Sequence, residues 1–130
     1  MKIHHFAIQV KDIDNSAKFY TEQLGFKIKT PKTTTEDGLY TYLNLDLDGA
    51  ELELIQIHDK SVKKENRNIS NPPMCPHIAL ESNDFDKDLE LLKKRGVKIF
   101  DGPHIIPNDV KMLTILDPDG YRIDIGQLLK

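Results

Sequence analysis

Apolar and polar residues alternate in eight short segments of the chain, and this period of two predicts β-strands. The predicted strands are, in chain order, 3–10, 26–30, 39–45, 51–57, 77–81, 97–100, 112–116 and 121–125. Two other segments repeat apolar residues at helical spacing, from Ile13 to Leu24 and from Phe85 to Leu92, and a glycine ends each of them. Each half of the chain therefore has one strand, one helix and three strands, in that order.

The second half of the sequence also repeats the first in its residues. His5-Phe6-Ala7-Ile8 corresponds to His77-Ile78-Ala79-Leu80, Gly25-Phe26-Lys27-Ile28 to Gly96-Val97-Lys98-Ile99, Asp12 to Asp84, and Gln56 to Gln127. An internal repeat of this length indicates two copies of one structural unit. We expect an α+β fold in which two βαβββ modules form a curved, cup-like mixed sheet with the helices on its outer face. The modules are residues 1–57 and 77–130, with 58–76 as the linker, in one structural domain.

Strand alternation separates the side chains of each module into two faces. Phe6, Ile8 and Val10 are expected to face the helix, which leaves His5 on the other face. Three other strands have the same division and turn Glu53, His77 and Asp124 towards the polar side. The two histidines are 72 residues apart and the two carboxylates 71, so all four occupy equivalent positions of the repeat.

Two imidazoles and two carboxylates are the ligands that divalent metals of intermediate softness prefer. Each of these side chains, taken alone, fits a solvated position on a strand, and only the shared register favours a metal. The sequence therefore predicts a metal site formed by His5, Glu53, His77 and Asp124 in a cup that holds a small molecule. His4 is expected to point to the opposite face from His5, so we interpret it as a boundary residue. His58 and His104 have no partner in the repeat, so we interpret them as surface residues.

The charge, apolar runs and cysteine count of the chain narrow the functions that it could have. The net charge of −3 and the lack of a basic stripe argue against a nucleic-acid partner. No apolar run reaches the roughly 18 residues of a membrane span, and the N-terminus lacks the pattern of a signal peptide, so we expect a cytoplasmic protein. The single cysteine, Cys75, excludes an internal disulfide and is interpreted as a small buried thiol rather than a ligand or nucleophile.

The segment from His5 to Phe26 closely resembles the opening of glyoxalase I and of the wider vicinal oxygen chelate superfamily, which also contains bleomycin-resistance proteins and dioxygenases. Residues 77–84 resemble the opening of the second module of that family, and residues 117–124 its closing segment. The resemblance implies a divalent metal, Zn²⁺ or Ni²⁺ first and Fe²⁺ or Mn²⁺ as alternatives, with His5, Glu53, His77 and Asp124 as ligands. It also implies a homodimer, which the long linker would permit by exchange of modules.

Two residues depart from the family pattern. Asp124 stands where the family usually has Glu, and its reach is shorter by about 1.5 Å, the length of one carbon–carbon bond. It would bind through water, act as a mobile base or pull its strand inwards. Gln9 stands where glutathione-using bacterial relatives tend to have an Arg, and Gln cannot form a bidentate ion pair with a carboxylate. We therefore expect a thiol other than glutathione.

The resemblance implies a metal-dependent lyase or isomerase. The specific expectation is a glyoxalase I-like conversion of a 2-oxoaldehyde–thiol adduct through an enediolate, with Glu53 and Asp124 as base and acid. One alternative is an acyl-thioester epimerase, and another is an extradiol-type Fe(II) dioxygenase that uses His5, His77 and one carboxylate. An alternative from another class is a metal-free drug-binding protein. The 7% aromatic content, with no Trp, weighs against that alternative.

Overall fold

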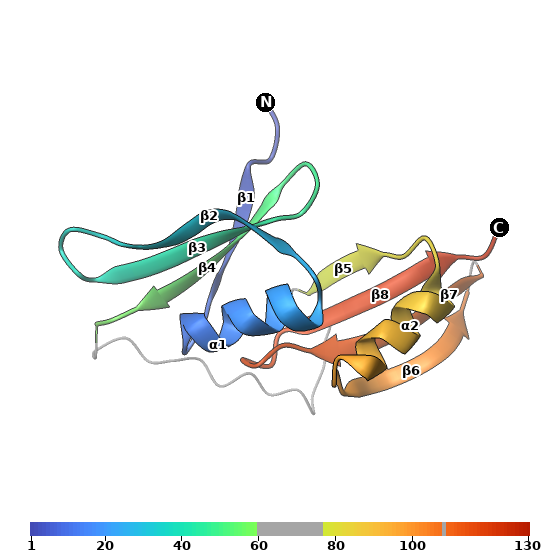
Figure 1. The fold of residues 1–130 in the computed structure, drawn as a ribbon. Helices are drawn as coiled ribbons and strands as arrows, with labels where there is room; N and C mark the ends of the chain where they lie inside the picture. The colour runs from blue at the N-terminus through green and yellow to red at the C-terminus, as the bar shows by residue number, and fades with distance from the viewer. Residues whose placement is uncertain (60–76, 108) are drawn as a thin grey trace. The chain divides into compact units, whose positions relative to one another are not determined.

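A computed structural model describes residues 1–59, 77–107 and 109–130. The chain divides between Asn66 and Arg67 into two compact units. Each unit contains one four-stranded mixed sheet and one helical segment between its first two strands, which confirms the α+β class and the βαβββ order in both halves (Figure 1). Most of the predicted linker, 58–76, lies outside the described residues, and so does Cys75. The linker assignment and the interpretation of Cys75 as a buried thiol therefore stay predictions.

The first unit is built on a sheet of order β1-β4-β3-β2. Its strands are β1 (His5–Gln9), β2 (Lys27–Thr34), β3 (Tyr40–Asp46) and β4 (Glu51–Ile57), with α1 (Ile13–Lys18) and the π-helical segment η1 (Phe19–Gln23) between the first two. β1 runs parallel to β4, and the other neighbours are antiparallel. Asp12 caps α1, since its carboxylate accepts the Asn15 N–H at 3.0 Å.

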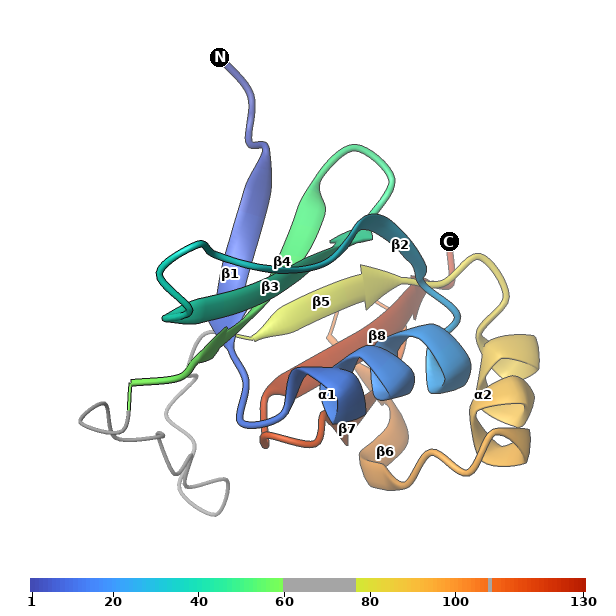
Figure 2. The same ribbon diagram turned by 60° about the vertical axis from the view of Figure 1, so that its left-hand side comes forward.

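The second unit repeats this arrangement with the strand order β5-β8-β7-β6. Its elements are β5 (Ile78–Glu81), α2 (Phe85–Lys94), β6 (Ile99–Ile106), β7 (Val110–Leu116) and β8 (Arg122–Leu128). β5 and β8 are the parallel pair, and they lie side by side in Figure 2. Asp84 caps α2 by accepting the Lys87 N–H at 3.2 Å, as its repeat partner does in the first unit.

Two glutamines tie the last strand of each unit to the start of its helix. The Gln56 side-chain oxygen accepts the Ile13 N–H at 2.9 Å, and the Gln127 side-chain oxygen accepts the Phe85 N–H at 2.8 Å. A helix N-terminus has backbone N–H groups without partners in the helix, and each glutamine satisfies one of them. The repeat in the sequence is therefore also a repeat of specific tertiary contacts.

The core of each unit lies on the apolar faces of its two central strands. Its buried side chains include Leu43, Leu45, Leu52 and Leu54 in the first unit, and Leu113, Ile115, Ile123 and Ile125 in the second. Each of these leaves less than a tenth of its surface exposed, so the apolar faces of β4 and β8 are fixed as predicted. Because side chains alternate along a strand, Glu53 and Asp124 are directed to the opposite faces.

One expectation for the first unit was wrong, and another was incomplete. Phe6 was expected to pack under the helix, but it is 56% exposed, whereas Val10 is 2% exposed. α1 packs against the central strands β3 and β4, and so leaves the beginning of the edge strand β1 uncovered. The expected single helix from 13 to 24 also changes type, because η1 begins at Phe19 and the Leu24 N–H bonds back to the Phe19 oxygen at 3.1 Å.

Candidate metal centre

In the first unit, the predicted ligands His5 and Glu53 come from the neighbouring parallel strands β1 and β4. The register pairs His5 with Glu51 and Ala7 with Glu53, so the two ligands are offset by two positions on the same face of the sheet. Glu53 is half-buried, and its carboxylate has no hydrogen-bond or ion-pair partner among the described residues. It is therefore available to a cation or a proton.

His5 is held by a chain of side chains that the sequence did not reveal. Its Nδ1 lies 2.8 Å from Nδ1 of His4, and the two rings meet edge to face at 5.1 Å. Nε2 of His4 lies 3.3 Å from the Glu51 carboxylate, whose other oxygen accepts the Asn44 side-chain N–H at 3.0 Å. His4 is thus not an isolated boundary residue, because it connects Glu51 to a predicted ligand.

With both imidazole rings neutral, this chain of contacts indicates which nitrogen of His5 is free. A carboxylate only accepts, so His4 donates its Nε2–H to Glu51, and in the neutral ring its Nδ1 must then accept. His5 therefore donates its Nδ1–H to His4. The lone pair of His5 Nε2 is left for another partner, which is the usual arrangement of a metal-binding histidine with an outer hydrogen bond.

In the second unit, the structure brings both predicted ligands together. Nε2 of His77 lies 3.4 Å from the Asp124 carboxylate, and both side chains are at least three-quarters buried. Arg122 contacts the two Asp124 oxygens at 2.8 and 3.1 Å, and the Thr114 hydroxyl donates to one of them at 2.8 Å. A carboxylate has about four sites for donors, and these contacts occupy them.

The two carboxylates therefore differ in a way that the repeat did not indicate. Arg122 occupies the position on β8 that Glu51 occupies on β4, and it neutralises the charge of Asp124. Alternation along β8 puts Arg122 and Asp124 on one strand face, but it gives no information on which side chains pair. Among the residues that the structure describes, Glu53 has no such cation beside it.

No group of three or more His, Cys, Asp and Glu side chains able to hold a metal occurs within the described part of the chain. Each unit contributes one histidine and one carboxylate to the predicted set, so the four-ligand site stays a prediction. His58 follows β4 and its Nε2 lies 2.7 Å from the Thr41 hydroxyl, while His104 is exposed on β6. Neither belongs to a predicted ligand pair.

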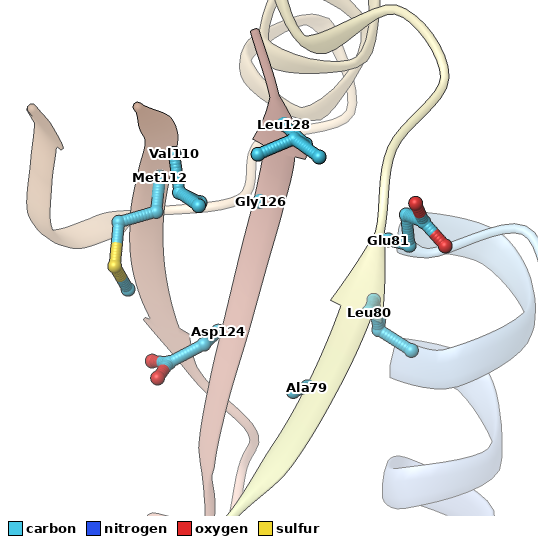
Figure 3. Close-up of a pocket in the computed structure, with 8 residues that line it drawn as sticks. All are labelled: Ala79, Leu80, Glu81, Val110, Met112, Asp124, Gly126 and Leu128. Atoms are coloured by element: carbon cyan, nitrogen blue, oxygen red, sulfur yellow. The ribbon is translucent and has the colours of Figure 1, made fainter. Parts of the chain in front are cut away.

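A pocket of about 390 Å³ adjoins Asp124 on the polar face of the second sheet (Figure 3). Its lining consists of Ala79, Leu80, Glu81, Val110, Met112, Asp124, Gly126 and Leu128. Pockets for small molecules begin at roughly 300 Å³ and are mostly apolar with a few polar groups, as this one is. No described helix is long and apolar enough to cross a membrane.

This chain belongs to the Glyoxalase/Bleomycin resistance protein/Dioxygenase superfamily, which it matches over residues 2–125. It is 32% identical to the uncharacterized protein YwbC of Bacillus subtilis over 97% of both chains. It is 26% identical to a lactoylglutathione lyase of Neisseria meningitidis, over 98% of this chain and 91% of the lyase. Among solved structures, SMU.1112c superposes with a TM-score of 0.82 at 23% identity, over 97% of this chain and 98% of that one.

Proposed function

We propose that this protein is a metal-dependent enzyme that acts on a 2-oxoaldehyde–thiol adduct in the manner of glyoxalase I. The observation that carries the proposal is the contact of His77 with Asp124 beside a ligand-sized pocket, at positions equivalent to His5 and Glu53. The similarity to lactoylglutathione lyase supports the same reaction class. A homodimer and a cytoplasmic location remain predictions from the sequence.

The donor set fits a divalent cation of intermediate softness, Zn²⁺ or Ni²⁺ in the first place. In the proposal, His5, Glu53 and His77 hold the ion, and Asp124 joins them once its ion pair with Arg122 opens. When bound, the ion polarises the substrate carbonyl and stabilises the negative charge that develops as a proton leaves the neighbouring carbon.

The two carboxylates, Glu53 and Asp124, have different roles in the proposed reaction. Glu53 has no partner among the described residues, so its oxygens can take the substrate proton and return it to the adjacent carbon. Asp124 is occupied by Arg122 and Thr114, and in this arrangement it orients His77 rather than carrying a proton. The proposed proton transfer therefore depends first on Glu53.

Elemental analysis and a thioester assay together test the proposal. Protein purified without added metal is expected to contain about one transition-metal ion per site and to convert adducts of methylglyoxal with small thiols to thioesters. Chelation should abolish this conversion, and Zn²⁺ or Ni²⁺ should restore it. A protein free of metal, or one whose turnover survives complete chelation, contradicts the proposal.

One observation favours a second candidate, the extradiol-type dioxygenase. If Asp124 stays paired with Arg122, the available ligands are His5, His77 and Glu53, which form the two-histidine, one-carboxylate set of non-haem Fe(II) oxygenases. Oxygen consumption with a catechol by the Fe(II)-loaded protein distinguishes this candidate from a lyase, because the lyase reaction consumes no oxygen.

We predict that replacing His4 by Gln weakens metal binding by about 10- to 100-fold, the usual effect of losing an outer hydrogen-bond partner. Nitrogen NMR of the metal-free protein should show His5 protonated at Nδ1 and not at Nε2. In His4→Gln, this preference should be lost. His104→Gln, at an exposed histidine, is the matched control and should change neither the His5 signals nor the affinity. A His5 ring protonated at Nε2 in the native protein contradicts the role of His4 and Glu51.

A further inference from the structure

The pocket of the second unit is centred on a residue without a side chain. The register places Gly126 on β8 between Glu81 of β5 and Met112 of β7. Asp124 and Leu128 lie two positions before and after it on the same strand face. Figure 3 shows Met112, Asp124 and Leu128 around Gly126, with Glu81 on the neighbouring strand β5, so Gly126 lies at the floor of the hollow.

The equivalent position in the first unit is filled. Ile55 stands there, between Gln9 of β1 and Tyr42 of β3. Gly126 does not have a positive φ, so its backbone would accept other residues. A Cβ atom at Gly126 would lie 3.3 Å from a Val110 methyl group. Space rather than backbone conformation therefore distinguishes Gly126 from its equivalent position, Ile55.

The walls of the pocket favour one chemical class. Ala79, Val110, Met112 and Leu128 present carbon and sulfur atoms, and the charged groups in the lining are the carboxylates of Glu81 and Asp124. The nearby cation of Arg122 is already paired with Asp124. An anion in this pocket would lie near Glu81 without a counter-ion, whereas an uncharged apolar group would bury its surface against the walls.

We propose that this pocket binds an uncharged apolar group of the substrate, up to the size of a benzyl group, and disfavours a carboxylate. Gly126 and Glu81 are then the residues that determine specificity. The inference rests on the proposed function only in naming the occupant a substrate, since the binding itself needs no metal. In a glyoxalase I-like reaction, the occupant is the carbon side chain of the 2-oxoaldehyde.

Benzyl alcohol and benzoate test the proposal, because they share size and shape and differ in charge. NMR titrations of the metal-free protein would follow the Met112 methyl group and the Gly126 amide. Benzyl alcohol is expected to shift both signals and to bind with an affinity about fivefold higher than that of benzoate. The difference is modest because Glu81 is exposed, and solvent screens its repulsion of the benzoate carboxylate. Glu81→Gln should remove this difference. Equal binding of the two probes by the native protein overturns the proposal.

Filling the hollow gives the second test. Gly126→Val should weaken benzyl alcohol binding by at least about tenfold, because its methyl groups occupy the space of the ligand. Ile55→Val, at the equivalent position of the first unit, is the matched control and should leave binding unchanged. Should Gly126→Val fail to fold, Leu128→Ala decides, since Leu128 is 55% exposed and its loss should weaken binding without damage to the core. Native affinity in a folded Gly126→Val protein or in Leu128→Ala overturns the proposal. Neither titration depends on bound metal. Failure of the metal and thioester assays would therefore contradict the proposed function without contradicting the pocket, and failure of the titrations would contradict the pocket without contradicting the proposed function.

Discussion

Proteins with His5→Ala or His77→Ala are expected to lose nearly all of their metal during purification. Each unit supplies one imidazole to the predicted site, so removal of either leaves the ion with a single nitrogen ligand from the predicted set. Loss of an outer partner already weakens metal binding by about 10- to 100-fold, and loss of a direct ligand should exceed that. Metal content measured by mass spectrometry and affinity measured against a competing chelator would both report the effect.

His104→Ala is the control, because it removes an exposed imidazole from the same unit as His77. It should retain the metal content of the native protein. Asp124 keeps its contacts with Arg122 and Thr114 in His77→Ala, so the apo proteins should have similar Tm values. Native metal content in both His5→Ala and His77→Ala would show that the histidines are not ligands.

Glu53→Gln is expected to reduce kcat by about 10²- to 10⁴-fold, the usual contribution of a positioned general base. The amide keeps the shape of the side chain but cannot take a proton. Glu53 is half-buried on the polar face of β4, opposite the core residues Leu52 and Leu54, so Tm should change little. Steady-state turnover of metal-loaded protein, with the metal content verified, measures the effect. Glu90→Gln, on an exposed face of α2, controls for the change in net charge.

Substitutions of Asp124 distinguish its role from that of Glu53. Asp124→Glu retains an ionised group with a longer reach and should lose less activity than Asp124→Asn, which weakens the ion pair with Arg122. The loss in Asp124→Asn should still be smaller than in Glu53→Gln, because Asp124 orients other groups in the proposal. If Asp124→Asn is the more damaging change, then Asp124 is the principal base and the assignment of Glu53 is wrong.

The sequence predicted the order of the elements and the faces of the central strands. Both follow from the local periodicity of apolar residues, which the repeat shows twice. The exposed position of Phe6 did not follow, because alternation assigns a face but not the part of that face that a helix covers. The π-helical segment at Phe19 likewise lacks a periodic signal.

For the site, the sequence indicated the residue types but not their partners. Alternation puts Arg122 and Asp124 on one strand face, yet the bidentate pair depends on the rotamers of both side chains. His4 was set apart from His5 because neighbours on a strand point to opposite faces. His4 lies just before β1, where this alternation no longer applies, and its ring turns back to His5.

The parallel pairing of β1 with β4, and of β5 with β8, bears on how each half of the site forms during folding. In each unit, the paired strands are the first and last of the module, so their pairing must close a loop that contains the helix and the other two strands. Closure of long loops is entropically costly, and contacts between distant residues form late. The antiparallel hairpins can form locally before the first and last strands pair. The strands that carry the histidine and the carboxylate of each pair therefore become neighbours only when the whole module has folded, and partly folded chains carry no competent half-site.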